Sequence, residues 1–275
     1  MLMKSLFSAI FLLTLYACGN NQTQSKTAIK NENKEKTISP YFGFLNQQKD
    51  SLIALPMDQA MESPEKYNYV IVENQISPLE FVQNKADNKE NNGRQTAQNF
   101  ANSEGSLFKI RNVIKSGEFG MLVNKSFIDQ YKVEKFTKVQ KETSPEIKEQ
   151  LEKKYNRKIN KSTTVAVLDD QSEFNLTVFE NQQDSALAVF SYAKDEQLIN
   201  LDFPALYDDI STWRVDDGGQ FENEAFQILT VLRSEQGISF ISIFWGAEGY
   251  ELNFYQPKKN VFTSAAQAYG YSSPL

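Results

Sequence analysis

Short β-favouring runs follow one another at a nearly regular interval through the C-terminal half of this chain. Polar turns such as residues 169–172 and 194–197 separate them. A spacing of about twelve residues is typical of an antiparallel meander, in which each strand pairs with the next one. The runs cover residues 163–168, 174–179, 186–192, 198–203, 225–233, 238–245 and 249–255. We therefore expect a curved, mainly antiparallel sheet.

One helix is clearly indicated before this meander, over residues 144–158. Ser144 is a favourable N-cap. Pro145 suits the first helical position, because the N–H that proline lacks would have no partner within the helix there. One apolar stripe follows at a spacing of four residues, formed by Ile147, Leu151 and Tyr155. The sequence therefore predicts an α+β fold, with this helix packed on the meander.

The N-terminal half gives weaker signals. Residues 67–72, 107–114 and 119–123 favour strands, and Ser77 followed by Pro78 favours a short helix at 77–80. Residues 83–106 are rich in Asn and contain Phe100 as their only large apolar side chain. We interpret that segment as a disordered insertion or linker; a functional lid is the alternative.

The chain contains no histidine and one cysteine, Cys18. The absence of histidine excludes Ser-His-Asp and Cys-His nucleophiles and histidine-based zinc or iron sites. A disulfide within the chain is excluded as well, so the fold depends on packing. We predict no catalytic, cofactor-binding or metal-binding residues and no cofactor.

Charge is distributed unevenly along the chain, whose net charge is −6. Residues 132–161 carry ten basic and five acidic side chains, whereas residues 162–275 carry five basic and seventeen acidic ones. The basic segment either packs near the acidic half and partly neutralises it, or provides one of two oppositely charged faces for partners.

Three groups of residues have both a functional and a structural interpretation. The acidic turns at Asp169–Asp170–Glu173 and Asp216–Asp217 offer oxygen ligands for calcium, but acidic residues are also ordinary turn formers. The lysines at 132, 135, 138 and 141 suit an anionic membrane surface or a half-buried element with a solvated face. The aromatic side chains at 245, 250, 254 and 255 suit a ligand pocket or, more simply, a core.

The N-terminal residues predict where the protein is located in the cell. Lys4 precedes an apolar run of ten residues, 6–15, which is too short to span a bilayer, and the sequence Leu15-Tyr16-Ala17-Cys18 follows. This sequence resembles the lipobox of bacterial lipoproteins. The resemblance implies lipidation of Cys18, palmitate included, removal of residues 1–17, and a membrane anchor. Gly19, in place of Asp, implies delivery to the outer membrane, facing the periplasm.

These features predict an order of segments along the chain. It is a signal peptide (1–17), a lipidated cysteine with a flexible tether (18–39), an N-terminal segment (40–82), a disordered insertion or linker (83–106) and a main α+β domain (107–275).

The favoured function is a non-catalytic envelope lipoprotein that binds a protein or a cell-wall component. Two alternatives remain open: a carboxylate-dependent hydrolase of an envelope polymer, and a carrier of a small apolar ligand. Apart from the membrane, the partner is unidentified. Nucleic acid is not expected as a partner, because the chain is acidic and carries an export signal.

Overall fold

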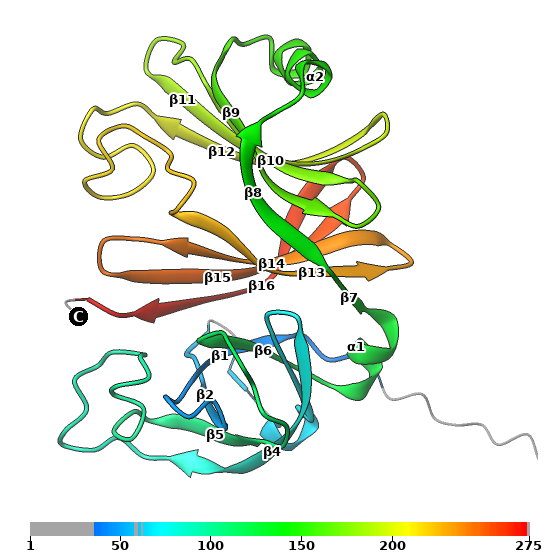
Figure 1. The fold of residues 1–275 in the computed structure, drawn as a ribbon. Helices are drawn as coiled ribbons and strands as arrows, with labels where there is room; N and C mark the ends of the chain where they lie inside the picture. Colours follow the sequence, from blue (N-terminus) through cyan, green and yellow to red (C-terminus); the bar gives the residue numbers. More distant parts are fainter. Residues whose placement is uncertain (1–35, 58–59, 62, 274–275) are drawn as a thin grey trace, which may run out of the picture. The chain divides into compact units, whose positions relative to one another are not determined.

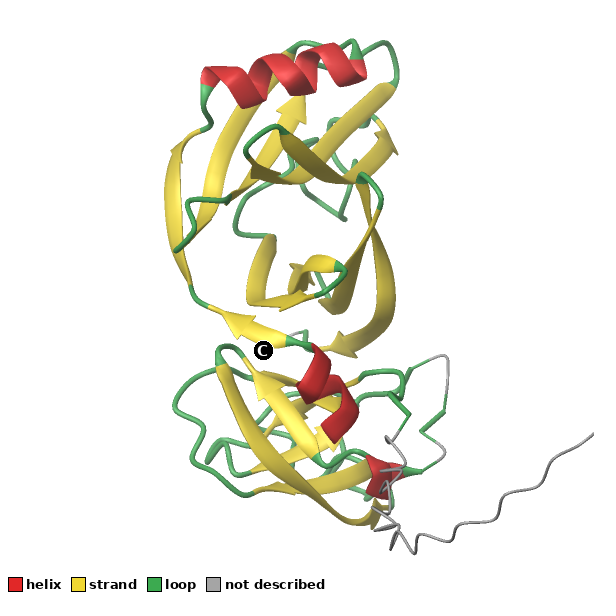
Figure 2. Ribbon diagram, turned by 90° about the vertical axis from the view of Figure 1, so that its right-hand side faces the viewer, coloured by secondary structure: helices red, strands yellow, loops and turns green. Residues whose placement is uncertain are grey.

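The fold is almost entirely β (Figures 1 and 2). The computed structural model describes residues 36–57, 60–61 and 63–273. Strands make up 52% and helices 9% of this part of the chain, and the strands form barrel-like sheets. The expected α+β class is therefore wrong. One well-formed helix was given too much weight, because many strands carry no local signal that distinguishes them from loops.

The first six strands close into a small barrel. Their order around it is β1-β2-β5-β4-β3-β6, and β6 pairs back with β1. A β-carbon at Gly43 would overlap the Leu52 side chain, so only glycine allows these strands to pack closely. The strands are β1 (Tyr41–Leu45), β2 (Ser51–Ala54), β3 (Tyr69–Val72), β4 (Gln75–Lys85), β5 (Gly105–Ile110) and β6 (Phe119–Val123); a 3₁₀ turn, η1 (Pro64–Lys66), precedes β3.

One expectation fails in this barrel. Residues 77–80 form part of β4 and not a helix, because pairing with two neighbours overrides the local helix signal. Pro78 is tolerated where β4 changes partner from β3 to β5. Residues 83–106 contain the end of β4 and the start of β5, joined by a loop in which the Asn99 side chain donates to Asn91 at 2.8 Å.

The remaining strands form one ten-stranded sheet in the order β7-β13-β14-β15-β16-β12-β11-β10-β9-β8. The expected strands of the meander are all present, and the pairs β9–β10, β11–β12, β13–β14 and β15–β16 are antiparallel. The sheets divide the chain near residue 130 and not at 107. The strands are β7 (Lys132–Glu134), β8 (Phe136–Glu142), β9 (Ile159–Leu168), β10 (Glu173–Phe179), β11 (Ser185–Lys194), β12 (Gln197–Leu206), β13 (Phe226–Ser234), β14 (Gly237–Trp245), β15 (Gly249–Lys258) and β16 (Val261–Tyr271).

The large sheet curls on itself (Figure 2). Aromatic side chains cluster on its inner face. Phe240 is fully buried and lies 5.2 Å from the Phe190 ring and 4.9 Å from the Phe262 ring, measured between centroids. Phe174 and Phe226 pack against the same rings. These rings therefore form a packed aromatic core inside the curled sheet.

Two α-helices lie in the described part of the chain. The shorter, α1 (Lys125–Gln130), joins the barrel to β7. The longer, α2 (Pro145–Tyr155), confirms the helix predicted from Ser144, whose side chain accepts a hydrogen bond from the Ile147 N–H. Its buried Leu151 packs on Phe179 and Val189. None of the helices within residues 36–273 is long and apolar enough to cross a membrane.

Candidate functional site

The ten-stranded sheet does not close into a complete barrel, because its two edge strands, β7 and β8, leave a gap along one line. β7 and β8 form an almost continuous strand interrupted only at Lys135, and the two halves use different partners. β7 pairs with residues 231–233 of β13, whereas β8 pairs with β9. Residues 226–230 of β13 consequently have no strand on that side. We call the gap between β8 and residues 226–230 the seam.

Strand irregularities accompany the seam on both sides. The pairing of β8 with β9 shifts register between Lys138 and Lys141, and the pairing of β13 with β14 shifts between Ile228 and Thr230. Bulges of this kind bend a strand and increase its twist. The register of β7 with β13, if continued, would place Lys138 opposite Gln227, but the two strands have diverged by that point.

The edge of β13 at the seam carries main-chain groups without strand partners. The Trp245 N–H donates to the Ala225 carbonyl at 2.8 Å, so the main-chain groups of Ala225 face β14. Because these groups alternate along a strand, those of Phe226 and Ile228 face the seam. An open edge of this kind is a template for pairing with another chain.

A cleft of about 370 Å³ occupies the seam. This volume lies at the lower end of the range for small-molecule sites. The aromatic and aliphatic side chains in it belong to the surface of the same core that fills the curled sheet. The lining residues are Phe136, Lys138, Val139, Gln140, Val165, Ala166, Asn223, Glu224, Phe226, Gln227 and Ile228.

The two sides of the seam differ in charge. Lys135, just before β8, and Lys138 and Lys141 within it are exposed, and Lys138 lines the cleft. Within the described residues, Lys138 makes no ion pair, whereas Lys141 lies 3.3 Å from a Glu173 carboxylate oxygen. On the other side, Glu224 accepts a long hydrogen bond of 3.4 Å from the Gln140 amide. The seam therefore offers one uncompensated cation beside an apolar floor.

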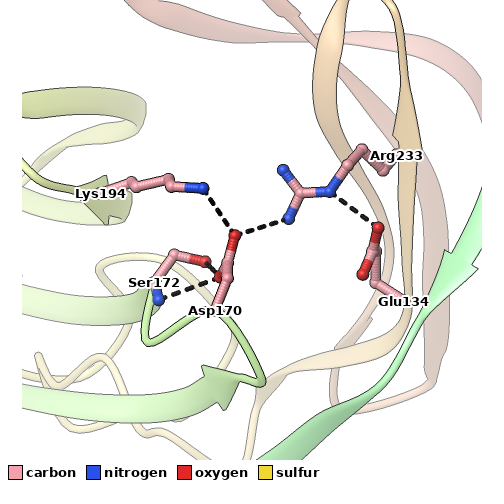
Figure 3. A network of polar contacts seen from close by, with 5 residues as sticks. All are labelled: Glu134, Asp170, Ser172, Lys194 and Arg233. Carbon is pink, nitrogen blue, oxygen red and sulfur yellow. Dashed lines mark hydrogen bonds and ion pairs between the residues drawn. The ribbon is translucent and has the colours of Figure 1, made fainter.

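A polar network fixes the closed end of the seam, where β7 still pairs with β13 (Figure 3). The guanidinium of Arg233 on β13 contacts Glu134 of β7 at 2.7 Å and Asp170 of the β9–β10 turn at 3.1 Å. Asp170 also accepts from Lys194, at the end of β11, at 2.7 Å. The network thus joins four separate elements at one point.

Asp170 is the centre of that network. Burial works to raise its pKa, but the hydrogen bonds from Lys194 and from the side chain and N–H of Ser172 outweigh burial and hold the pKa well below its ordinary value. Ser172 itself is almost fully buried. A carboxylate satisfied in this way is a structural anchor and not a proton donor at neutral pH.

A second carboxylate, Asp217, orders the loop that leads into β13. It accepts hydrogen bonds from the N–H groups of Thr212, Trp213, Arg214 and Gly219, all at 2.7–2.9 Å. Burial works to raise the pKa of Asp217, but these four donors outweigh burial and lower it. The ordered loop sets the position of Asn223 and Glu224 at the seam.

The structure assigns the sequence candidates mainly to structural roles. Tyr250 and Phe254 are buried in the core, and Tyr255 is nearly so. The acidic turns hold Asp170 and Asp217 in the networks above, and no cluster of three or more potential metal ligands occurs among the described residues. The basic stretch forms β7 and β8, a half-buried strand with a solvated face. Cys18 lies outside the described residues.

The sequence did not reveal the second side of the seam. Phe226 and Ile228 look like ordinary core positions, and nothing local marks their strand edge as unpaired. Arg233 is one of only five basic residues after residue 161, which was a usable signal, but its partners Glu134 and Asp170 come from distant segments.

Comparison with family models, with curated proteins and with solved structures finds no match for this chain.

Proposed function

We propose that this chain is a lipid-anchored envelope protein whose folded part is a non-catalytic binding module. The single observation that carries the binding role is the seam, where an unpaired strand edge, an apolar cleft and an uncompensated lysine lie together. The sequence Leu15-Tyr16-Ala17-Cys18 supports anchoring through Cys18, and Gly19 in place of Asp supports a position in the outer membrane, facing the periplasm.

Two observations favour a binding module over the alternatives. A carrier inside the curled sheet requires interior space, and aromatic rings occupy that interior. A glycoside hydrolase requires two carboxyl groups at its cleft. Among the residues that line the cleft at the seam, Glu224 is the only one with a carboxyl side chain.

The anchor is tested by labelling cells with a palmitate analogue and separating their membranes. We expect the wild-type chain to carry the label and to sediment with the outer membrane. The Cys18→Ser variant is expected to carry no label and to leave the membrane fraction. Equal sedimentation of both chains without label would overturn the lipid anchor.

The binding role is tested with a photo-crosslinking amino acid at Gln140 or Gln227, on the two sides of the seam. The matched control is Val113, which is 85% exposed and lies on the barrel side of the chain. We expect adducts of one defined size from both seam positions and none of that size from Val113. The same adducts from all three positions, or none from the seam, would contradict a binding role there.

A further inference from the structure

We propose that the seam accepts, as an added strand, an extended polypeptide segment of a partner that carries apolar and acidic side chains. This inference rests on the proposed function, and it names the chemistry of the partner. Three features of the seam lead to it: the direction of the unpaired main-chain groups, the shape of the cleft, and the position of Lys138.

The main-chain groups favour a strand over a compact ligand. Phe226 and Ile228 direct their N–H and C=O groups toward the seam, two residues apart along β13. An extended chain repeats its own donors and acceptors at the same interval, so it satisfies both residues at once. A small amphiphile has no such repeat and would leave some of these groups unpaired.

The cleft determines what one face of the added strand carries. Phe136, Phe226 and Ile228 line its floor and connect it to the aromatic core. Successive side chains of a strand point to opposite faces. The side chains on the inward face of the added strand are therefore mainly apolar, and they cover the mouth of the core.

The charges determine which charged side chain accompanies the apolar ones. Lys138 is exposed, lines the cleft and makes no ion pair within the described residues. It pairs with Ala166, as Phe136 pairs with Leu168, so its side chain lies on the same face of β8 as Phe136. Glu224, on the opposite side of the seam, accepts a hydrogen bond of 3.4 Å from the neutral Gln140 amide. An acidic side chain that the added strand directs toward Lys138 compensates it, whereas a basic one adds a like charge.

The test uses the mature chain from residue 18 with Cys18→Ser, and two fluorescent peptides of about eight residues in which Val is combined with Glu or with Lys on both faces of the strand. We expect the Glu–Val peptide to bind, and the Lys–Val peptide to bind at least about tenfold more weakly. The Lys138→Glu variant should reverse this preference. The Lys258→Glu variant, an exposed lysine at the end of β15, is the matched control and should leave both affinities unchanged.

Two further measurements show whether binding occurs by strand pairing. Amide exchange followed by NMR should slow at Phe226 and Ile228 when the Glu–Val peptide is added, and remain as before at Gln227, which faces β14. Methylation of alternate main-chain nitrogens of the peptide should abolish binding.

Several outcomes would overturn the proposal. Equal binding of both peptides, an equal response of Lys138→Glu and Lys258→Glu, or unaltered affinity after methylation each excludes an added acidic strand. Displacement of the peptide by decanoate, with decanoate protecting the same amides, would instead indicate a small-amphiphile site. Crosslinks at the seam without peptide binding would refute this inference and leave the proposed function standing.

Discussion

Arg233 illustrates how few residues fix the closed end of the seam. Its guanidinium bridges Glu134 and Asp170, which lie far apart in the sequence. All three side chains are about one-third exposed, so water screens part of their attraction. The network therefore positions strands as well as stabilising the fold, because it holds β7 against β13 immediately before β8 and β13 diverge.

Replacement of Arg233 by Gln should lower the free energy of unfolding by about 1 to 2 kcal/mol, because it leaves two half-buried carboxylates without their shared partner. Urea unfolding followed by circular dichroism measures this change. The control is Arg111→Gln, which removes an ion pair with Glu80 whose side chains are 59% and 54% exposed. We expect the control to alter stability by less than about 0.5 kcal/mol. Equal losses in both variants would contradict the anchoring role of Arg233.

Asp170 should make stability depend on pH in a defined direction. Its folded-state pKa is lowered, so its contribution is complete above the unfolded-state pKa and is lost as pH falls through the folded-state pKa. Asp170→Asn should therefore be less stable than the wild type at about pH 7, and the difference should shrink below about pH 4. Urea unfolding at several pH values checks this; a difference that grows toward low pH would be inconsistent with the network.

Among the elements, β15 and β16 show how closely two strands can pack. Gly270 of β16 lies against the ring of Tyr250, and a β-carbon at Gly270 would overlap that ring. Tyr250 cannot move aside easily, because it is buried, lies 4.3 Å from the Phe119 ring, and donates from its hydroxyl to the Gln95 carbonyl at 2.8 Å.

Gly270→Ala should consequently lower the free energy of unfolding by about 2 to 3 kcal/mol, as expected for overpacking in a core. Gly246 provides the matched control, because the nearest atom to a β-carbon there is the Gly249 carbonyl oxygen at 3.6 Å. Gly246→Ala should cost less than about 1 kcal/mol. Thermal or urea unfolding of both variants measures the two changes in free energy. Equal losses would mean that Gly270 does not pack tightly against the Tyr250 ring.

The sequence predicted the elements whose signal is local. The strands from β9 to β15 alternate with polar turns, and α2 begins with a side-chain cap at Ser144. The barrel was missed because its closure depends on pairs such as Tyr41 with Leu122, which are remote in sequence. β16 was missed because most of its side chains are exposed, so its residues lack the apolar alternation of a half-buried strand.

The candidate site could be predicted only in part for the same reason. The lysines of β8 are visible in the sequence as a basic row, and the aromatic residues of the C-terminal half indicate a substantial core. Whether β8 pairs with β13 is a property of the folded sheet. The register shifts near Lys138 and Ile228 that accompany the seam have no sequence signature.

The large sheet of this molecule has an aromatic core on its inner face and one open line in its wall. The core needs no ligand to fill it, and the seam presents the unpaired edge of β13 beside Lys138. An anchor at Cys18 would keep this edge near the membrane, where envelope proteins are concentrated. We therefore expect binding to require an open seam, and not only the residues that line it.

Closing the seam by a covalent link tests this claim most directly. Gln140 and Glu224 face each other across it, with their side chains 3.4 Å apart, and Cys18 is the only cysteine of the chain. In the Cys18→Ser background, cysteines at 140 and 224 are joined by a short bismaleimide. We predict that the linked protein retains its circular dichroism spectrum and loses affinity for the Glu–Val peptide by at least about tenfold relative to the unlinked double variant. Unchanged affinity after linking would show that the partner binds elsewhere.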